Sequence, residues 1–80
     1  MAVQKKDIDI GRLIVQVLKN KERSVAWLAR NVGCDASNLA KTLKNGRYIY
    51  TDLLLRISIV LETDFFSYYS EKLPNQIKNR

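Results

Sequence analysis

The side chains best suited to contact an external partner lie in the segment Ala36–Lys44, where polar and small residues alternate with apolar ones. At the repeat of an α-helix, Cys34 at its entrance and Leu39 and Leu43 within it face inward. The opposite face carries short, polar and basic side chains, namely Ala36, Ser37, Ala40, Lys41 and Lys44. Such a face offers hydroxyl, ammonium and methyl groups for recognition, so we predict a helix that packs on one side and binds on the other.

A second short helix is predicted just before this segment. Apolar or small residues recur there at helical spacing: Val25, Leu28, Ala29 and Val32. Ser24 is placed to accept a hydrogen bond from the first turn, and Asp35 is placed to do the same for the next helix. Gly33 lies between the two helices, where a positive φ that glycine adopts without steric cost commonly ends a helix.

Three further helices should surround this pair. The first, from Asp7 or Asp9 to Lys19, carries a buried stripe formed by Ile10, Leu13, Ile14, Val17 and Leu18. Thr51 is the predicted cap of a helix over residues 52–61, which is apolar nearly all round and is therefore expected at the centre of the fold. A turn at Thr63-Asp64 leads into a short aromatic helix over residues 65–72. We find no convincing strand pattern, so the sequence predicts an all-α fold of five helices.

Length and composition predict one compact domain, with residues 1–6 as a flexible arm and residues 73–80 as a polar tail. The chain has 80 residues, of which 46% are hydrophobic and 28% charged, as is ordinary for a globular domain. An apolar run of about 18 residues, as a membrane span needs, is missing, and residues 1–18 lack a signal-peptide core. We therefore expect a cytoplasmic location and no membrane partner.

The single cysteine and the lack of histidine limit the chemistry further. Cys34 cannot form an internal disulfide, and no ordinary zinc site can be assembled, so we expect no metal and no cofactor. A cysteine among apolar neighbours is usually a packing residue, although a reactive thiol is the alternative. An enzyme is not expected, because a glycine-rich phosphate loop and a nucleophile beside a base are both missing.

Positive charge is concentrated on the predicted helix pair. The formal net charge is +6, and residues 19–47 carry seven basic side chains against two acidic ones, whereas residues 48–80 carry four of each. Such a distribution would attract a polyanion and bind phosphates without regard to sequence. The alternative is a lysine-rich face that is merely solvated.

The spacing of Ala29, Gly33 and Leu39 resembles the helix-turn-helix of the Cro/cI-type phage repressors, also called the XRE-like family. The resemblance runs from Ile8 to Tyr69 and includes the Asn45-Gly46 pair and the L-L-x-R-I pattern that follows it. It implies a lambda-repressor-like fold in which Ala29 is small because the second helix crosses close above it. Many of these repressors have glutamine where this chain has Val25 and Ala36-Ser37, so their operators cannot be transferred to it.

The resemblance implies a transcriptional regulator that binds double-stranded DNA sequence-specifically, with the helix Ala36–Lys44 in the major groove. Ser37 could bond to either kind of base, Lys41 could reach guanine, and the two alanines could contact thymine methyl groups. The expected base-contacting residues are Ala36, Ser37, Asn38, Ala40 and Lys41. The expected phosphate-binding residues are Arg23, Ser24, Lys44, Asn45, Arg47 and Tyr48.

The aromatic segment Phe65–Tyr69 is the expected surface of a weak homodimer, formed in solution or only on DNA. So short a helix cannot turn four aromatic rings inward, and we predict that Phe66 and Tyr69 fill the core while the others are partly exposed. The alternative is that all of them complete a small core. Trp27 is interpreted as packing between the first two helices, with base stacking as the alternative.

Two other kinds of partner stay open. The same fold could serve as a protein-interaction module, such as an antitoxin or an accessory regulator, and salt-dependent DNA binding would separate that function from DNA recognition. RNA binding is the other, although the chain lacks the sheet with stacking aromatic residues that many RNA-binding domains use.

Overall fold

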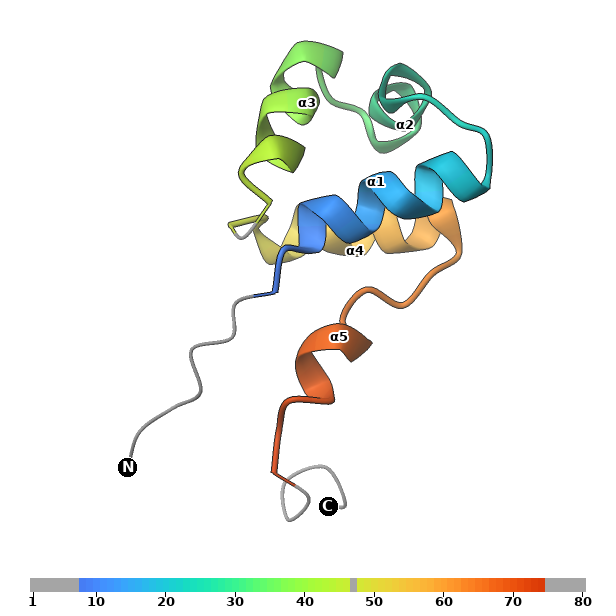
Figure 1. Ribbon diagram of the computed structural model, residues 1–80. Helices are drawn as coiled ribbons and strands as arrows, with labels where there is room; N and C mark the ends of the chain where they lie inside the picture. Colours follow the sequence, from blue (N-terminus) through green and yellow to red (C-terminus); the bar gives the residue numbers. More distant parts are fainter. Residues whose placement is uncertain (1–7, 47, 75–80) are drawn as a thin grey trace.

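Five helices account for the regular structure of residues 8–46 and 48–74, the part of the chain that the computed structural model describes (Figure 1). They are α1 (Ile10–Asn20), α2 (Val25–Val32), α3 (Ala36–Lys44), α4 (Thr51–Leu61) and α5 (Ser67–Ser70). No strand occurs in these residues, so the predicted all-α class is confirmed, and the helices form a compact assembly. The expected arm at residues 1–6, Arg47, and residues 75–80 of the expected tail lie outside the described part.

The first three helices begin where local capping places them. The carboxylate of Asp9 accepts a hydrogen bond from the amide of Arg12 at 3.1 Å. The hydroxyl of Ser24 accepts from the Trp27 amide at 3.0 Å, and the carboxylate of Asp35 accepts from the Asn38 amide at 3.0 Å. Each bond satisfies an amide that has no partner within its own helix, and the predicted caps at Ser24 and Asp35 are confirmed.

The turn between α2 and α3 depends on Gly33, which has φ +81° and ends α2. Its amide and that of Cys34 both donate to the carbonyl of Ala29, at 2.9 and 3.0 Å. A Cβ atom at Gly33 would meet nothing within 4 Å, so glycine is favoured here for its backbone conformation and not for lack of space. This prediction is also confirmed.

The core consists of apolar side chains from α1 to α4 together with Phe65, which precedes α5. Its buried members are Ile10, Ile14, Leu18, Leu28, Ala29, Val32, Leu39, Leu43, Leu53, Leu54, Ile57, Leu61 and Phe65. The predicted stripe of α1 is buried at Ile10, Ile14 and Leu18, while Leu13 and Val17 pack at its margin and are only partly buried.

Helix α4 differs from the prediction in two ways. Thr51 is its first residue and does not cap it, since the N-cap is Tyr50 and no side chain bonds to the first turn. The helix is not surrounded on all sides either, because Leu55 and Ile59 are 48% and 66% exposed. A helix in so small an assembly buries one side, and in α4 that side is formed by Leu53, Leu54, Ile57 and Leu61.

The aromatic segment also departs from the prediction. Phe65 is fully buried, Phe66 is partly buried, and Tyr68 and Tyr69 are 37% and 39% exposed, so the assignment of Phe66 and Tyr69 to the core was wrong. The reason is a turn held by Asp64, whose carboxylate accepts from the amides of Phe66 and Ser67 at 3.0 and 3.2 Å. The helix begins after this turn and spans only Ser67–Ser70, with Phe66 as its N-cap residue. Phe65 enters the core from the turn before the helix.

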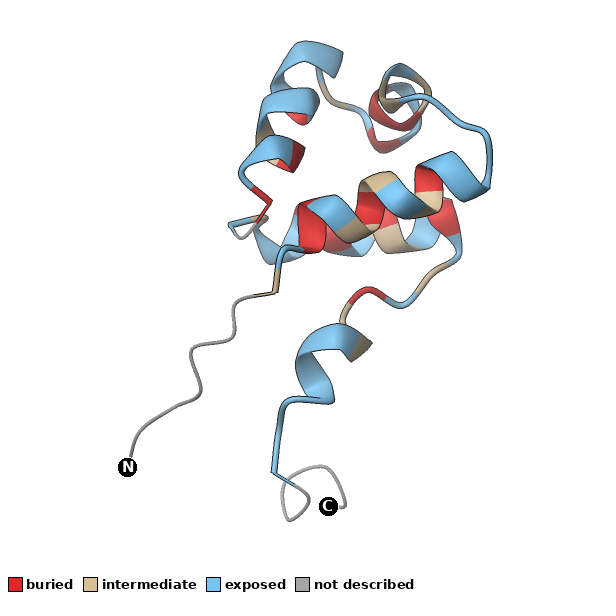
Figure 2. Cartoon of the chain, viewed as in Figure 1, coloured by how far each residue is buried: buried red, intermediate tan, exposed pale blue. Residues whose placement is uncertain are grey.

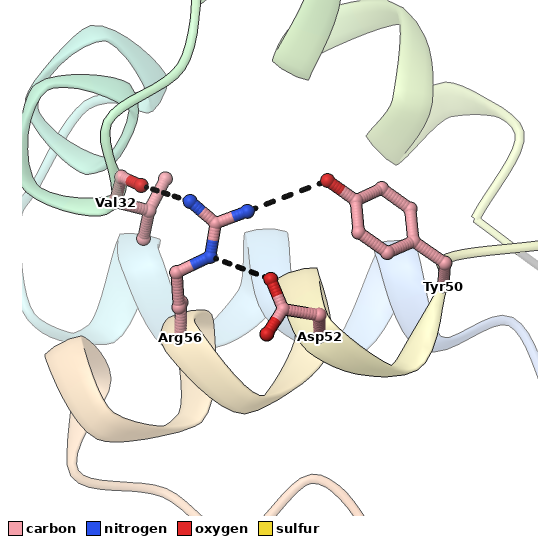
Figure 3. Close-up of polar contacts among 4 residues, drawn as sticks. All are labelled: Val32, Tyr50, Asp52 and Arg56. Carbon is pink, nitrogen blue, oxygen red and sulfur yellow. Dashed lines mark hydrogen bonds and ion pairs between the residues drawn. The ribbon is translucent and has the colours of Figure 1, made fainter.

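Arg56 joins α4 to the end of α2 (Figure 3). Its guanidinium donates from Nη1 to the carbonyl of Val32 at 2.7 Å and from Nη2 to the hydroxyl of Tyr50 at 3.3 Å. Nε lies 3.3 Å from Asp52 Oδ2, an ion pair whose alignment falls short of a hydrogen bond. A carbonyl at the end of α2, immediately before the turn into α3, is thereby satisfied by a side chain of α4.

Candidate functional site

The outer face of α3 is open along its whole length. All five residues predicted to contact bases are exposed, and so is Lys44, whereas Leu39 and Leu43 on the other face are buried (Figure 2). The division into a packing face and an exposed face therefore agrees with the helical pattern. The exposed set is Ala36, Ser37, Asn38, Ala40 and Lys41.

Helices α1 and α2 hold α3 at the edge of the assembly. Both pack against α3, with α2 beside it and the start of α1 near its C-terminal end (Figure 1). Gly46, just beyond α3, is buried against Gly11 in the first turn of α1. The inner face of α3 is thus covered by other helices, and its outer face is available to a partner.

An open groove of about 580 Å³ lies at the C-terminal end of α3 and gathers three of the predicted phosphate-binding residues. It is lined by Asp9, Lys44, Asn45, Gly46 and Tyr48. The backbone turns tightly here, since the Asn45 amide donates to the Lys41 carbonyl at 3.2 Å and the Tyr48 amide donates to the Asn45 carbonyl at 3.3 Å. Tyr48 is 85% exposed, so its hydroxyl is free to reach a ligand. Arg47 lies outside the described residues.

The other two predicted phosphate-binding residues lie at the start of α2, which is away from the C-terminal end of α3 (Figure 1). Ser24 uses its hydroxyl oxygen to cap α2 and remains exposed, so the hydroxyl proton can still be donated outward. The guanidinium of Arg23 lies 4.8 Å from the centre of the Trp27 ring, a cation–π contact that holds an exposed arginine in place.

Trp27 and Cys34 both pack at the margin of the core. Each is partly buried against it, which agrees with their interpretation as packing residues. For Trp27 the cation–π contact adds a role that the sequence analysis missed, since nothing in the spacing of Arg23 and Trp27 fixes the direction of either side chain.

Asp9 is the residue of this groove that the sequence analysis did not identify. The sequence pattern offered Asp7 or Asp9 as the start of the first helix, and the proximity of Asp9 to Lys44 and Tyr48 arises only when α1 and the end of α3 pack together. It introduces a negative charge beside groups expected to bind phosphate.

Comparisons with protein-family models, with curated proteins and with solved structures gave no match. Among the described residues, no helix is both long enough and apolar enough to cross a lipid bilayer.

Proposed function

We propose that this protein binds double-stranded DNA sequence-specifically as a transcriptional regulator, with α2 and α3 acting as a helix-turn-helix. The observation that carries the proposal is the outer face of α3, which exposes all five candidate base-contacting residues while the inner face is buried. An exposed helix face that carries short side chains and a lysine suits insertion into the major groove of B-DNA.

In this mechanism α3 enters the major groove, and α2 lies across the sugar-phosphate backbone. Ser37 and Lys41 form hydrogen bonds to base edges, with Lys41 directed to the O6 and N7 acceptors of guanine. Ala36 and Ala40 allow close approach and contact thymine methyl groups. Asn38, on the flank of the same face, bonds to a base or to a phosphate.

Phosphate contacts would come from both ends of the helix pair. Arg23 and Ser24 supply a guanidinium and a hydroxyl at the start of α2, and Lys44, Asn45 and Tyr48 supply an ammonium, an amide and a hydroxyl at the end of α3. Arg47 is added to the second group on its place in the sequence. Such contacts fix the orientation of a protein on the duplex, and base contacts then provide specificity.

A weak homodimer through the segment Phe65–Tyr69 belongs to this proposal. Phe65 is committed to the core, so the exposed parts of Tyr68 and Tyr69 would form the contact. Two copies on half-sites about one helical turn apart would lengthen the recognised sequence beyond the few base pairs that one short helix contacts.

The second candidate function is a protein-interaction module, and the exposed pair Leu55 and Ile59 on α4 favours it. Neighbouring apolar side chains on an open helix face are common at protein interfaces. Here α3 would serve only as part of the scaffold.

One experiment separates these functions. The protein would be incubated with a pool of random duplexes, and the bound fraction would be amplified and sequenced over several rounds. DNA recognition predicts a short enriched motif, and a dimer predicts that the motif is palindromic. A pool that stays random after selection would support the interaction module.

A further inference from the structure

Charges of opposite sign line the groove at the end of α3. Lys44, Asn45 and Tyr48 come from the end of α3 and the loop beyond it, while Asp9 comes from the residue before α1. The two parts are joined by a backbone hydrogen bond from Gly11 to Gly46 at 3.3 Å. The carboxylate of Asp9 is close to that junction, since its Oδ1 would lie 2.7 Å from a Cβ atom at Gly46. The packing of α1 on α3 therefore fixes a carboxylate in the groove.

The structural role of Asp9 does not require a negative charge. Its Oδ1 caps α1 by accepting from the Arg12 amide at 3.1 Å, and asparagine or serine caps helices about as well as aspartate. The charge adds only a modest interaction with the helix dipole. Apart from this capping role, Asp9 lies in the same groove as Lys44, Asn45 and Tyr48, the candidate phosphate-binding residues.

The charge of Asp9 also acts on other side chains. Burial raises the pKa of Tyr69 above its usual value, and the negative charge of Asp9 raises it further. The field of this carboxylate thus extends from the α3 groove to α5. Because Asp9 is exposed, salt would screen its field over distances of about 10 Å.

We propose that Asp9 limits phosphate binding at the end of α3 and so lowers the affinity for duplex DNA of every sequence by about the same factor. The inference rests on the proposed function. A phosphate held by Lys44, Asn45 and Tyr48 would lie beside the Asp9 carboxylate, and two like charges repel each other whatever the base sequence. Base preference, which the outer face of α3 provides, would be unaffected.

Two substitutions at Asp9 separate its charge from its capping role. Asp9→Asn removes the charge and keeps the cap, whereas Asp9→Glu keeps the charge and loses a good cap. Asp64→Asn is the matched control, because the Asp64 carboxylate also accepts a hydrogen bond from a backbone amide three residues on, that of Ser67, but does not line the groove. Affinity would be measured by fluorescence anisotropy for a selected duplex and for a scrambled one, over a series of salt concentrations.

We expect Asp9→Asn to tighten binding to both duplexes by about two- to fivefold at low ionic strength, with the gain shrinking as salt rises. Asp9→Glu should lower the melting temperature without tightening binding, and Asp64→Asn should leave affinity unchanged. If Asp9→Asn gave the same affinities as Asp64→Asn, the inference about Asp9 would be wrong, but the proposed DNA binding would not be contradicted. If the wild-type protein had no salt-dependent affinity for either duplex, the proposed function itself would fail.

Discussion

Gly11 and Gly46 meet backbone to backbone, with the Gly11 amide donating to the Gly46 carbonyl at 3.3 Å. This bond satisfies an amide in the first turn of α1 that has no partner within its helix. A Cβ atom at Gly11 would come 2.7 Å from the Gly46 Cα and would press on the Leu43 carbonyl. Neither position has room for a side chain, so glycine is required at both. The contact between them sets where the end of α3 lies on α1.

Gly46→Ala should lower the free energy of unfolding by on the order of 1–3 kcal/mol, because the new methyl group would overlap the backbone of Gly11. Urea denaturation would measure the loss. Gly33 provides the control. Asparagine tolerates a positive φ, so Gly33→Asn should be nearly neutral while Gly46→Asn should be strongly destabilising. If Gly33→Asn and Gly46→Asn lowered the free energy of unfolding equally, the backbones of Gly11 and Gly46 would not be in close contact.

Arg56→Met should destabilise the fold by about 1–3 kcal/mol, because the Val32 carbonyl would lose its donor in a partly buried position. The aliphatic part of the side chain is retained, so little packing is lost. Asp52→Asn is the control: it weakens only an exposed ion pair and should cost less than about 1 kcal/mol. Thermal unfolding of both variants tests this, and a larger loss in Asp52→Asn would contradict it.

Lys41 and Lys44 should affect DNA binding in different ways. Lys41→Ala should cost about 1–3 kcal/mol on the selected site and relax the preference at one base position. Lys44→Ala should weaken binding to all duplexes equally and reduce the salt slope by about one. For the wild-type protein, three to six phosphate contacts predict a slope of log affinity against log salt of roughly −3 to −5. If the two variants behaved alike, the assignment of the base-contacting face would have to be abandoned.

Tyr68→Ala should shift any solution dimer toward monomer, as sedimentation velocity over a concentration series would show. The Tyr68 ring packs on Phe65, with 6.3 Å between ring centres, so the melting temperature must be followed to exclude local unfolding. The paired variant Leu55→Ala/Ile59→Ala tests the competing surface on α4. A dimer that persisted in Tyr68→Ala and was lost in the α4 variant would place the interface on α4.

Stability should fall at alkaline pH partly through Tyr69. Its pKa is raised above 10.0 in the folded protein, by burial first and by Asp9 second. The unfolded chain then loses this proton at lower pH than the folded one, so the contribution is fully present below about pH 10 and is lost as pH rises through the folded pKa. Tyr69→Phe should flatten the decline of melting temperature above pH 10, and Asp9→Asn should flatten it partly. A decline identical to that of the wild type would rule out this linkage.

The sequence alone determined the bounds of α2 and α3. Capping is a contact between residues three apart, as at Ser24 and Trp27 or Asp35 and Asn38, so its signal is complete within a short stretch of chain. The positive φ of Gly33 is equally local. The outward set on α3 followed from helical periodicity once Leu39 and Leu43 were recognised as its buried side.

Tertiary structure decided the features that depend on which neighbour covers a side chain. The pattern of α4 offered more apolar residues than its neighbours cover, so only the packed fold shows that Leu55 and Ile59 are exposed. Likewise Phe65 and Phe66 are indistinguishable in type, and Phe65 is the one buried in the core because a turn held by Asp64 precedes the helix. Asp9 joins the groove at the end of α3 only because Gly11 and Gly46 let two backbones touch, a contact between distant residues that no local pattern encodes.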